Sequence, residues 1–292
     1  MYEHLAESAL QHIDLPKAER IDCLKRNRWI GYDKAKKLIL KMEDLLKHPD
    51  THRMPNIIIK AATNNGKSSI LNRFAELHPI VDDPFEDRLV MPVLSMEIPA
   101  GPTPDAIYEG ILRKLKLPFR QSYSKALKFE MVKNGIQDFS VKMFCFDELH
   151  VIANTTKLVK MQLLDTLKYL SNETRVPIVG AGTVEAHVLL LSDGQLANRF
   201  EPYPLPQWQP NEEFQQLIAS FEKLIPLKLP SNLHDPALAM RIYSETEGWI
   251  GEVHAYLARA AEYAIKKDIE CISDDVLDKI DWMSPTKRRI TS

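Results

Sequence analysis

Residues 56–69 constrain the fold more than any other stretch of this chain. Three isoleucines at positions 57–59 predict a buried strand, and a loop ending in Gly66-Lys67-Ser68 follows. The amphipathic segment 70–77 predicts a helix directly after the loop. Strand, loop and helix in this order are typical of a P-loop, in which backbone amides at the helix N-terminus hold phosphate groups.

The loop also carries the side chains that phosphate chemistry requires. Lys67 is expected to reach the β- and γ-phosphates of a nucleotide, and the Ser68 hydroxyl is expected to bind Mg²⁺. Ala61 stands where the pattern has its first glycine. If the backbone were left-handed there, alanine would cost on the order of 1 kcal/mol. Without a partner motif, a surface loop that happens to contain Gly-Lys-Ser remains an alternative.

The partner motif follows a second apolar run. Residues 141–146 predict a strand that ends in Asp147-Glu148. In P-loop proteins the first carboxylate holds Mg²⁺ and the second polarises the attacking water. His150 gives the helicase-like string Asp-Glu-x-His, but no second motor domain accompanies it, and we expect an ordinary residue at a helix start. The two motifs together favour a P-loop ATPase that uses ATP and Mg²⁺.

Further strands and helices complete an α/β fold. Runs at 89–97, 176–181 and 201–205 predict three more strands, each separated from the next by helical patterns, which is typical of a parallel five-stranded sheet. After Pro206 only helical patterns remain. We therefore expect a helical extension over 1–24, a nucleotide-binding α/β core over 25–206, a small all-helical lid over 207–281 and a basic tail over 282–292.

Composition and charge narrow the class. The formal net charge of −2 argues against a globally basic nucleic-acid coat. Three widely spaced cysteines indicate neither a disulfide framework nor a metal site. There is no signal peptide and no apolar run of membrane-spanning length, so we expect a cytoplasmic protein without membrane contact. Segment 113–133 nevertheless carries seven Lys and Arg residues against one acid, Glu130. It is either a solvated face or a surface for DNA.

Several strings together resemble one family. They are Arg53-Met54-Pro55-Asn56, Asn64-Asn65-Gly66-Lys67-Ser68, Val179-Gly180-Ala181-Gly182-Thr183, Gln195-Leu196-Ala197-Asn198-Arg199-Phe200 and Glu247-Gly248-Trp249-Ile250-Gly251-Glu252. In this order they resemble the TniB family, AAA+ ATPases of transposons that are related to the TnsC regulators. The resemblance extends over residues 29–280 and implies that the core and lid are those of an AAA+ protein.

The resemblance also implies roles for individual residues. Trp29, Ile30 and Tyr32 would pack the adenine, and the phosphate loop would comprise Asn64, Asn65, Gly66, Lys67, Ser68 and Ser69. Ser68 and Asp147 would hold Mg²⁺. The catalytic residues would be Glu148, Thr183 at the sensor-1 position and Arg199 as an arginine finger acting on a neighbouring subunit. Thr183 could instead cap a helix, and Arg199 could be a surface cation. His254 stands where many AAA+ proteins have the sensor-2 arginine, so we expect slow hydrolysis.

The family resemblance directs the functional prediction to DNA. It implies that Lys114, Lys116, Arg120 and Lys125 contact the phosphates of duplex DNA without reading its sequence. It further implies a homo-oligomer, as a ring or helical filament, that recruits a transposase and possibly a target selector. Hydrolysis would disassemble the oligomer. A helicase loader and a nucleotide-switched signalling or defence NTPase are the alternatives. The symmetry, the transposase and the roles of residues 1–24 and of the basic tail stay open.

Overall fold

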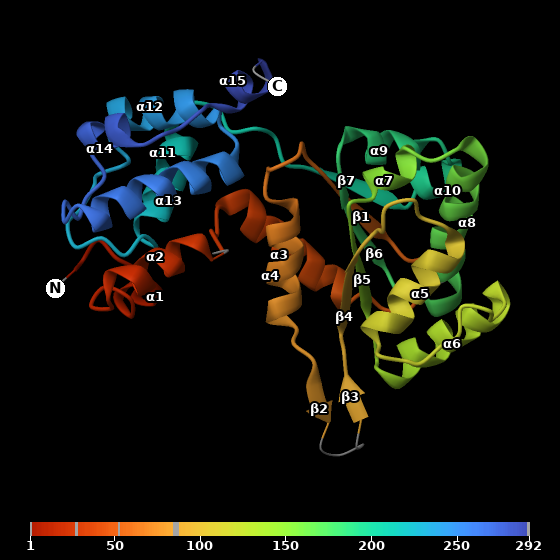
Figure 1. Cartoon of the computed structure of the whole chain (residues 1–292). Helices are drawn as coiled ribbons and strands as arrows, with labels where there is room; N and C mark the ends of the chain where they lie inside the picture. Colours follow the sequence, from red (N-terminus) through yellow and green to blue (C-terminus); the bar gives the residue numbers. More distant parts are fainter. Residues whose placement is uncertain (1, 27–28, 52, 84–87, 291–292) are drawn as a thin grey trace. The chain divides into compact units, whose positions relative to one another are not determined.

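The computed structural model describes residues 2–26, 29–51, 53–83 and 88–290 (Figure 1). These residues form two compact units. The sheet unit comprises Lys34–Thr63 and Lys67–Pro206, and the helical unit comprises Met1–Asp33, Asn64–Gly66 and Gln207–Ser292. None of the described helices is both long and apolar enough to cross a lipid bilayer.

A parallel sheet of five strands is the centre of the sheet unit. Its order is β4-β5-β6-β1-β7, and every neighbouring pair is parallel. The strands are β1 (Asn56–Lys60), β4 (Val93–Glu97), β5 (Met143–Asp147), β6 (Ile178–Gly182) and β7 (Phe200–Pro204). In β1, β5 and β6 the side chains that point to either face of the sheet are buried. This explains why these strands are continuous apolar runs, because both faces of the sheet are covered. The predicted five-stranded parallel α/β fold is confirmed.

Helices cover both faces of this sheet. They are α3 (Asp33–Leu46), α4 (Lys67–Leu77), α5 (Pro104–Lys114), α6 (Lys125–Asp138), α7 (His150–Ala153), α8 (Lys157–Thr174), α9 (Val184–Leu191) and α10 (Gly194–Ala197). Figure 1 shows α4 on one face and α5, α8 and α9 on the other. The largest apolar cluster contains Ile58, Phe144 and Phe146 from the sheet and Ile107 and Leu167 from the helices.

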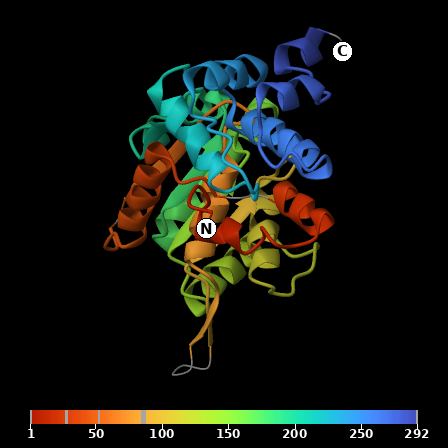
Figure 2. The same cartoon turned by 90° about the vertical axis from the view of Figure 1, so that its left-hand side faces the viewer.

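The predicted strand at 89–97 is wrong in one respect, because the chain forms two strands there. Arg88–Val90 is β3, which pairs with β2 (Val81–Asp83) in a separate antiparallel hairpin, and β4 starts only at Val93. Pro92 lies at the break. It has no N–H for a ladder, and its carbonyl accepts from Lys142 N at 2.9 Å and Met143 N at 3.1 Å. The hairpin, which the sequence did not predict, extends away from the large sheet (Figures 1 and 2).

The helical unit contains the helices predicted after Pro206. They are α11 (Glu212–Glu222), α12 (Pro236–Thr246), α13 (Ile250–Lys266), α14 (Asp274–Lys279) and α15 (Pro285–Ile290), joined by α1 (Glu7–Leu10) and α2 (Lys17–Lys25). Ile21 and Leu24 of α2 belong to the same apolar cluster as Phe214 and Leu257. α1 and α2 therefore group with these helices, and the predicted boundaries of an extension over 1–24 stay a prediction. Part of the basic tail forms α15, and its last two residues lie outside the described ranges.

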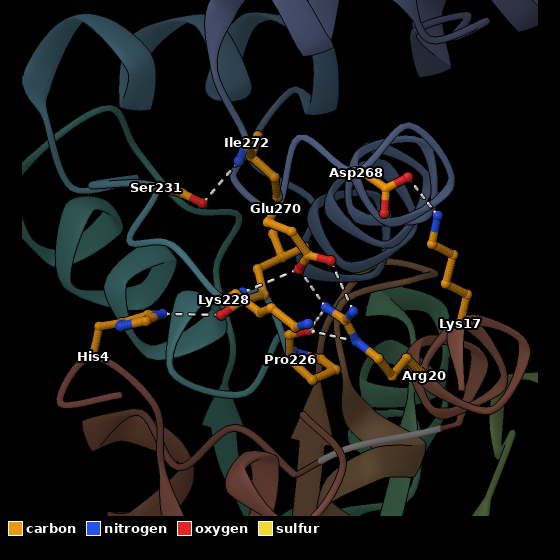
Figure 3. A network of polar contacts seen from close by, with 10 residues as sticks. His4, Lys17, Arg20, Pro226, Lys228, Ser231, Asp268, Glu270 and Ile272 are labelled. Carbon is orange, nitrogen blue, oxygen red and sulfur yellow. Dashed lines mark hydrogen bonds and ion pairs between the residues drawn. The ribbon is translucent and has the colours of Figure 1, made fainter. Parts of the chain in front are cut away.

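Buried charge holds α2 within this unit (Figure 3). The Arg20 guanidinium donates to both carboxylate oxygens of Glu270, at 2.8 and 2.5 Å, and twice to the carbonyl of Pro226, at 3.2 and 2.6 Å. Nearby, Lys17 donates to Asp268 at 2.7 Å and the His4 ring contacts the Leu227 carbonyl at 3.0 Å. Every polar group of Arg20 that enters the interior thus finds an oxygen, as a buried charge requires.

Candidate nucleotide-binding site

Three of the predicted motifs meet at the carboxyl edge of the sheet. Lys60, the last residue of β1, pairs with Gly182 of β6, and Phe146 of β5 pairs with Gly180. The P-loop follows β1, Asp147 is the last residue of β5, and Thr183 follows β6. Because carboxyl ends of parallel strands share an edge, the sequence motifs converge there, as ligand sites in such sheets do.

Lys67 is the buried cation of the site. Lys67 is the first residue of α4 and is 5% exposed. Its Nζ donates to the carbonyls of Ala61 at 3.2 Å and Ala62 at 2.9 Å. Burial lowers the Lys67 pKa, and the charges of Glu148 and Asp147 oppose this shift. An ammonium has three donors, and two are used by these carbonyls. A phosphate oxygen supplies the negative charge and the acceptor that this buried cation fits.

The loop backbone accommodates its unusual residues. Asn64 and Gly66 have left-handed φ angles of 61° and 82°, and these residue types adopt such a backbone most readily. Ala61 does not have a positive φ, and its N–H donates to the Gly182 carbonyl at 3.1 Å. The strain considered for Ala61 is therefore absent. Asn65 is buried, and Ser68 and Ser69 are exposed in the first turn of α4.

Asp147 is the last residue of β5, and the backbone conformation changes sharply at Glu148. Asp147 Oδ1 accepts from Glu148 N at 2.8 Å, and both side chains are partly exposed. Glu148 has a φ of 58°, a left-handed conformation that is uncommon for a residue with a long side chain. Glu97, which the sequence analysis did not single out, pairs with Asp147 across the neighbouring strands. The edge therefore presents carboxylates at two adjacent strand ends.

His150 contacts the predicted catalytic carboxylate. Its Nε2 lies 3.2 Å from Glu148 Oε2. The sequence predicted an ordinary residue at a helix start, and His150 is indeed the first residue of α7, but it is also part of the site. The Asp-Glu-x-His string was the available signal. The sequence analysis set it aside because no second motor domain accompanies the string.

Thr183 makes a contact that the sequence did not predict. It occupies the N-cap position of α9, yet its side chain accepts no capping hydrogen bond. Its hydroxyl instead donates to the Glu185 carboxylate. This hydrogen bond, followed by one from the Glu185 backbone, lowers the Glu185 pKa. Nothing in the sequence around Glu185 marked it as a member of the site.

Arg199 lies at the opposite edge of the same sheet. It immediately precedes β7, and its carbonyl accepts from Asn56 N, at the start of β1, at 2.8 Å. The loop after β1 begins five residues further on, about 16 Å away at about 3.3 Å per residue. The guanidinium donates to Asn172 on α8 at 2.5 Å. The structure thus separates Arg199 from the Lys67 of its own chain.

The basic segment 113–133 divides into paired and exposed cations. Buried Lys128 donates to Asp105 at 3.0 Å and to Glu109 at 2.9 Å, Arg113 pairs with Glu109, and Lys133 lies 3.7 Å from Glu173. The four predicted DNA contacts are all exposed and form no ion pair with the described residues: Lys114, Lys116, Arg120 and Lys125. They lie at the end of α5, in the following loop and at the start of α6.

The predicted adenine and sensor-2 residues belong to the helical unit. Ile30 is buried, and the Tyr32 ring packs edge-on against Trp208 with centroids 5.1 Å apart. Trp29 is half-buried. His254 packs against Phe221, and it lines, together with Ile30, a small apolar cavity of about 20 Å³. The structure therefore brings Ile30 and His254 to one place within this unit.

The donor set at the sheet edge fits a hydrated divalent cation. Among the described residues no group of three His, Cys, Asp or Glu side chains could enclose a metal ion. Mg²⁺ in phosphate-binding sites usually keeps several waters and takes one or two protein oxygens in addition to the phosphates. Ser68 and Asp147 offer such oxygens, so the residues present fit Mg²⁺ bound together with a nucleotide.

The fold is that of a P-loop protein of the AAA+ type. It combines a parallel five-stranded sheet, a P-loop after β1, an Asp-Glu pair at the end of β5 and a helical unit. Residues 20–210 match the family described as "Bacterial TniB protein". The chain belongs to the TniB family. A search of curated protein sequences gave no match.

Solved structures agree on the fold. The ORC2 protein of Aeropyrum pernix, in ADPNP and ADP complexes, superimposes with a TM-score of 0.64 at 14% identity, covering 92% of this chain and 74% of that one. The Aeropyrum pernix ORC1 protein in complex with DNA gives 0.58 at 12% identity, covering 93% and 69%. The RuvB branch-migration motor of Thermotoga maritima gives 0.53 at 14% identity, covering 88% and 72%.

Proposed function

We propose that this protein is an ATP-dependent regulator of transposition that assembles on duplex DNA and recruits a transposase. The observation that carries the proposal is the division of the predicted site between two edges of one sheet. Lys67, Asp147 and Glu148 are at the carboxyl edge, whereas Arg199 is at the amino edge. A site that needs all four residues requires a second copy of the chain.

ATP with Mg²⁺ would supply the reactive γ-phosphoryl group and its charge neutralisation. Lys67 would bind the β- and γ-phosphate oxygens, and Ser68 and Asp147 would hold the metal. Glu148 would orient the attacking water and accept its proton. The Thr183 hydroxyl would break its hydrogen bond with Glu185 and turn toward the same water. Arg199 of one copy would leave Asn172 and stabilise charge in the site of the next.

Four exposed cations support the DNA part of the proposal. Asp105, Glu109 and Glu173 pair with Arg113, Lys128 and Lys133, and no ion pair among the described residues involves Lys114, Lys116, Arg120 or Lys125. Each phosphate neutralised by such a side chain releases a counterion, so affinity falls with salt. The ORC1 relative was solved in complex with DNA, which supports a similar partner here. A transposase is proposed as a partner because of the resemblance to the TnsC regulators.

The central test compares DNA binding by the wild-type protein and Arg199→Ala, with and without a non-hydrolysable ATP analogue. We expect tight binding of duplex DNA only with nucleotide, and electron micrographs should then show rings or filaments. Arg199→Ala should bind nucleotide normally and lose nucleotide-dependent assembly. Equally tight DNA binding without nucleotide, or persistent monomers with it, would contradict the proposal.

The DNA surface has its own test with a matched control. Alanine at Lys114, Lys116, Arg120 or Lys125 should weaken binding to all sequences alike and reduce the slope of log K against log salt by about 1 per residue. Lys133→Ala removes the same charge from the same segment, but Lys133 pairs with Glu173. It should leave the slope unchanged. An equal effect of all five substitutions would indicate a general loss of charge rather than a surface.

A further inference from the structure

We propose that His150 is a positioning residue that holds the Glu148 carboxylate in its catalytic orientation. The inference rests on the proposed function, since it assigns a further residue to the same hydrolytic site. Among the described residues, His150 provides the polar contact to the Glu148 carboxylate, with Nε2 3.2 Å from Oε2. A glutamate has three rotatable side-chain bonds, so a fixed neighbour is needed to select one orientation.

The backbone around Glu148 is fixed on both sides. Asp147 Oδ1 accepts from Glu148 N at 2.8 Å, and Leu149 N donates to the Ala181 carbonyl of β6 at 2.9 Å. Between these anchors Glu148 adopts its left-handed φ of 58°. Backbone strain of this kind persists where the surrounding structure determines it, and it gathers at functional sites. The Cα of Glu148 is therefore well defined, whereas its carboxylate depends on a side-chain contact.

The backbone at His150 is also held in place, by close packing against β6. Leu149 packs where a side chain on Gly180 would be, because a Cβ there would lie 2.1 Å from Leu149 Cδ1. A Cβ on Gly182 would lie 2.6 Å from Ala186 Cβ and 3.3 Å from His150 N. Both β6 glycines thus allow the start of α7 to approach the strand closely. The imidazole is presented from this packed junction rather than from a loop.

The two ring nitrogens have different surroundings. His150 Nδ1 is buried and has no hydrogen-bond partner among the described residues, while Nε2 faces the carboxylate. A buried N–H without an acceptor is costlier than a bare ring nitrogen. The arrangement therefore favours the tautomer with the proton on Nε2, the ring nitrogen that lies 3.2 Å from Glu148 Oε2.

In the orientation that contacts His150, the Glu148 carboxylate also acts on the phosphate-binding lysine. Burial lowers the pKa of Lys67, and Glu148 has the larger of the two carboxylate effects that oppose it, ahead of Asp147. The Glu148 charge therefore already acts on the phosphate-binding lysine while it contacts His150. For this reason loss of the contact should slow hydrolysis rather than accelerate it.

Steady-state ATPase measurements on three full-length proteins separate positioning from packing. His150→Leu should lower kcat by about tenfold or more and change KM less than about twofold. His150→Gln keeps an N–H at the place of Nε2 and should remain within about threefold of the wild type. Binding of a fluorescent ATP analogue should be equal in all three. An unchanged or raised kcat in His150→Leu overturns the inference, as does equal loss in both variants.

Nitrogen NMR of the nucleotide-free protein gives a readout that is independent of activity. The His150 ring, assigned by the signal that His150→Gln removes, should show the proton on Nε2. Glu148→Gln should shift this signal, and an unaffected ring would overturn the inference. If the wild type bound ATP but did not hydrolyse it, the proposed function would fail. The NMR result would then decide alone whether His150 positions Glu148.

Discussion

Two regions of the molecule treat charged side chains in opposite ways: the interior of the helical unit and the carboxyl edge of the sheet. In the helical unit the Arg20 guanidinium meets two carboxylate oxygens and a carbonyl, and Glu222 accepts from three backbone amides. At the edge of the sheet unit, among the described residues, Lys67 has two carbonyls for three donors, and Glu148 has a left-handed backbone and a single side-chain contact, with His150.

The difference separates structural from functional charge. A saturated charge has no capacity for a ligand, and its removal leaves a partner unsatisfied in the interior. An incompletely satisfied charge contributes less to folding, but it retains the capacity to interact with phosphate, metal or water. Substitutions at Arg20 and Glu222 should therefore change stability, whereas substitutions at Glu148 should change chemistry.

The largest expected effect is on hydrolysis in Glu148→Gln. Glutamine keeps the shape of the side chain and cannot accept the proton of the attacking water. We expect kcat to fall about 10²- to 10⁴-fold, with nucleotide binding and the thermal midpoint unchanged. Glu76→Gln is the control, because Glu76 is exposed on α4 and contacts only Arg73 among the described residues. A large loss of stability in Glu148→Gln would contradict the comparison.

The next largest effect is on the stability of Arg20→Leu. The substitution removes the guanidinium from the largely buried Glu270 carboxylate and from the buried Pro226 carbonyl, which should cost about 3–5 kcal/mol in the free energy of unfolding. Urea titration of the full-length protein measures this value. Lys17→Ala is the matched control, because the Lys17–Asp268 pair is exposed and should contribute at most about 1 kcal/mol. Similar losses in both variants would show that burial does not distinguish the two pairs.

Glu222→Gln should have an intermediate effect on stability. The Glu222 carboxylate accepts from Ser231 N at 2.7 Å, Asn232 N at 2.9 Å and Leu233 N at 2.8 Å. An amide replaces one acceptor by a donor that faces a backbone N–H, so we expect a loss of about 2 kcal/mol. Exposed Glu213, on the same helix, provides the control Glu213→Gln, which should lie within about 0.5 kcal/mol of the wild type. A neutral Glu222→Gln would mean that the loop at 231–233 does not need its charged acceptor.

The sequence was informative where a motif coincides with a strand end. Apolar runs predicted the five parallel strands, and a parallel sheet places the residues after β1, β5 and β6 at one edge. The position of Lys67, Asp147 and Thr183 at this edge could therefore be predicted from the sequence, whereas their roles stay predictions. The break at Pro92 was harder to predict, because β3 and β4 are both apolar and only hydrogen bonding distinguishes them.

The side-chain contacts of the site could not be predicted in this way. The contact between His150 and Glu148 depends on the left-handed backbone of Glu148 and on the close packing over Gly180, neither of which has a sequence pattern. Glu185 is two residues beyond Thr183 in an ordinary first turn of a helix. The position of α2 was equally difficult to predict, because Arg20 pairs with Glu270, 250 residues further along the chain.

The smallest expected effect is the pH dependence of the Arg20 contact. Burial alone would raise the Glu270 pKa, but hydrogen bonds from Arg20 and Lys228 N hold it below its ordinary value of about 4.5. Because the folded-state pKa is the lower one, the stabilisation is complete above the unfolded-state value and is lost as the pH falls through the folded-state value. The difference in unfolding free energy between wild type and Arg20→Leu should therefore narrow from pH 7 toward pH 4 and below. Glu270→Gln removes the titrating group, and Arg20→Leu added to it should give a difference that does not vary with pH. A difference that stays constant in the wild-type background would show that Glu270 is not the carboxylate whose charge Arg20 stabilises.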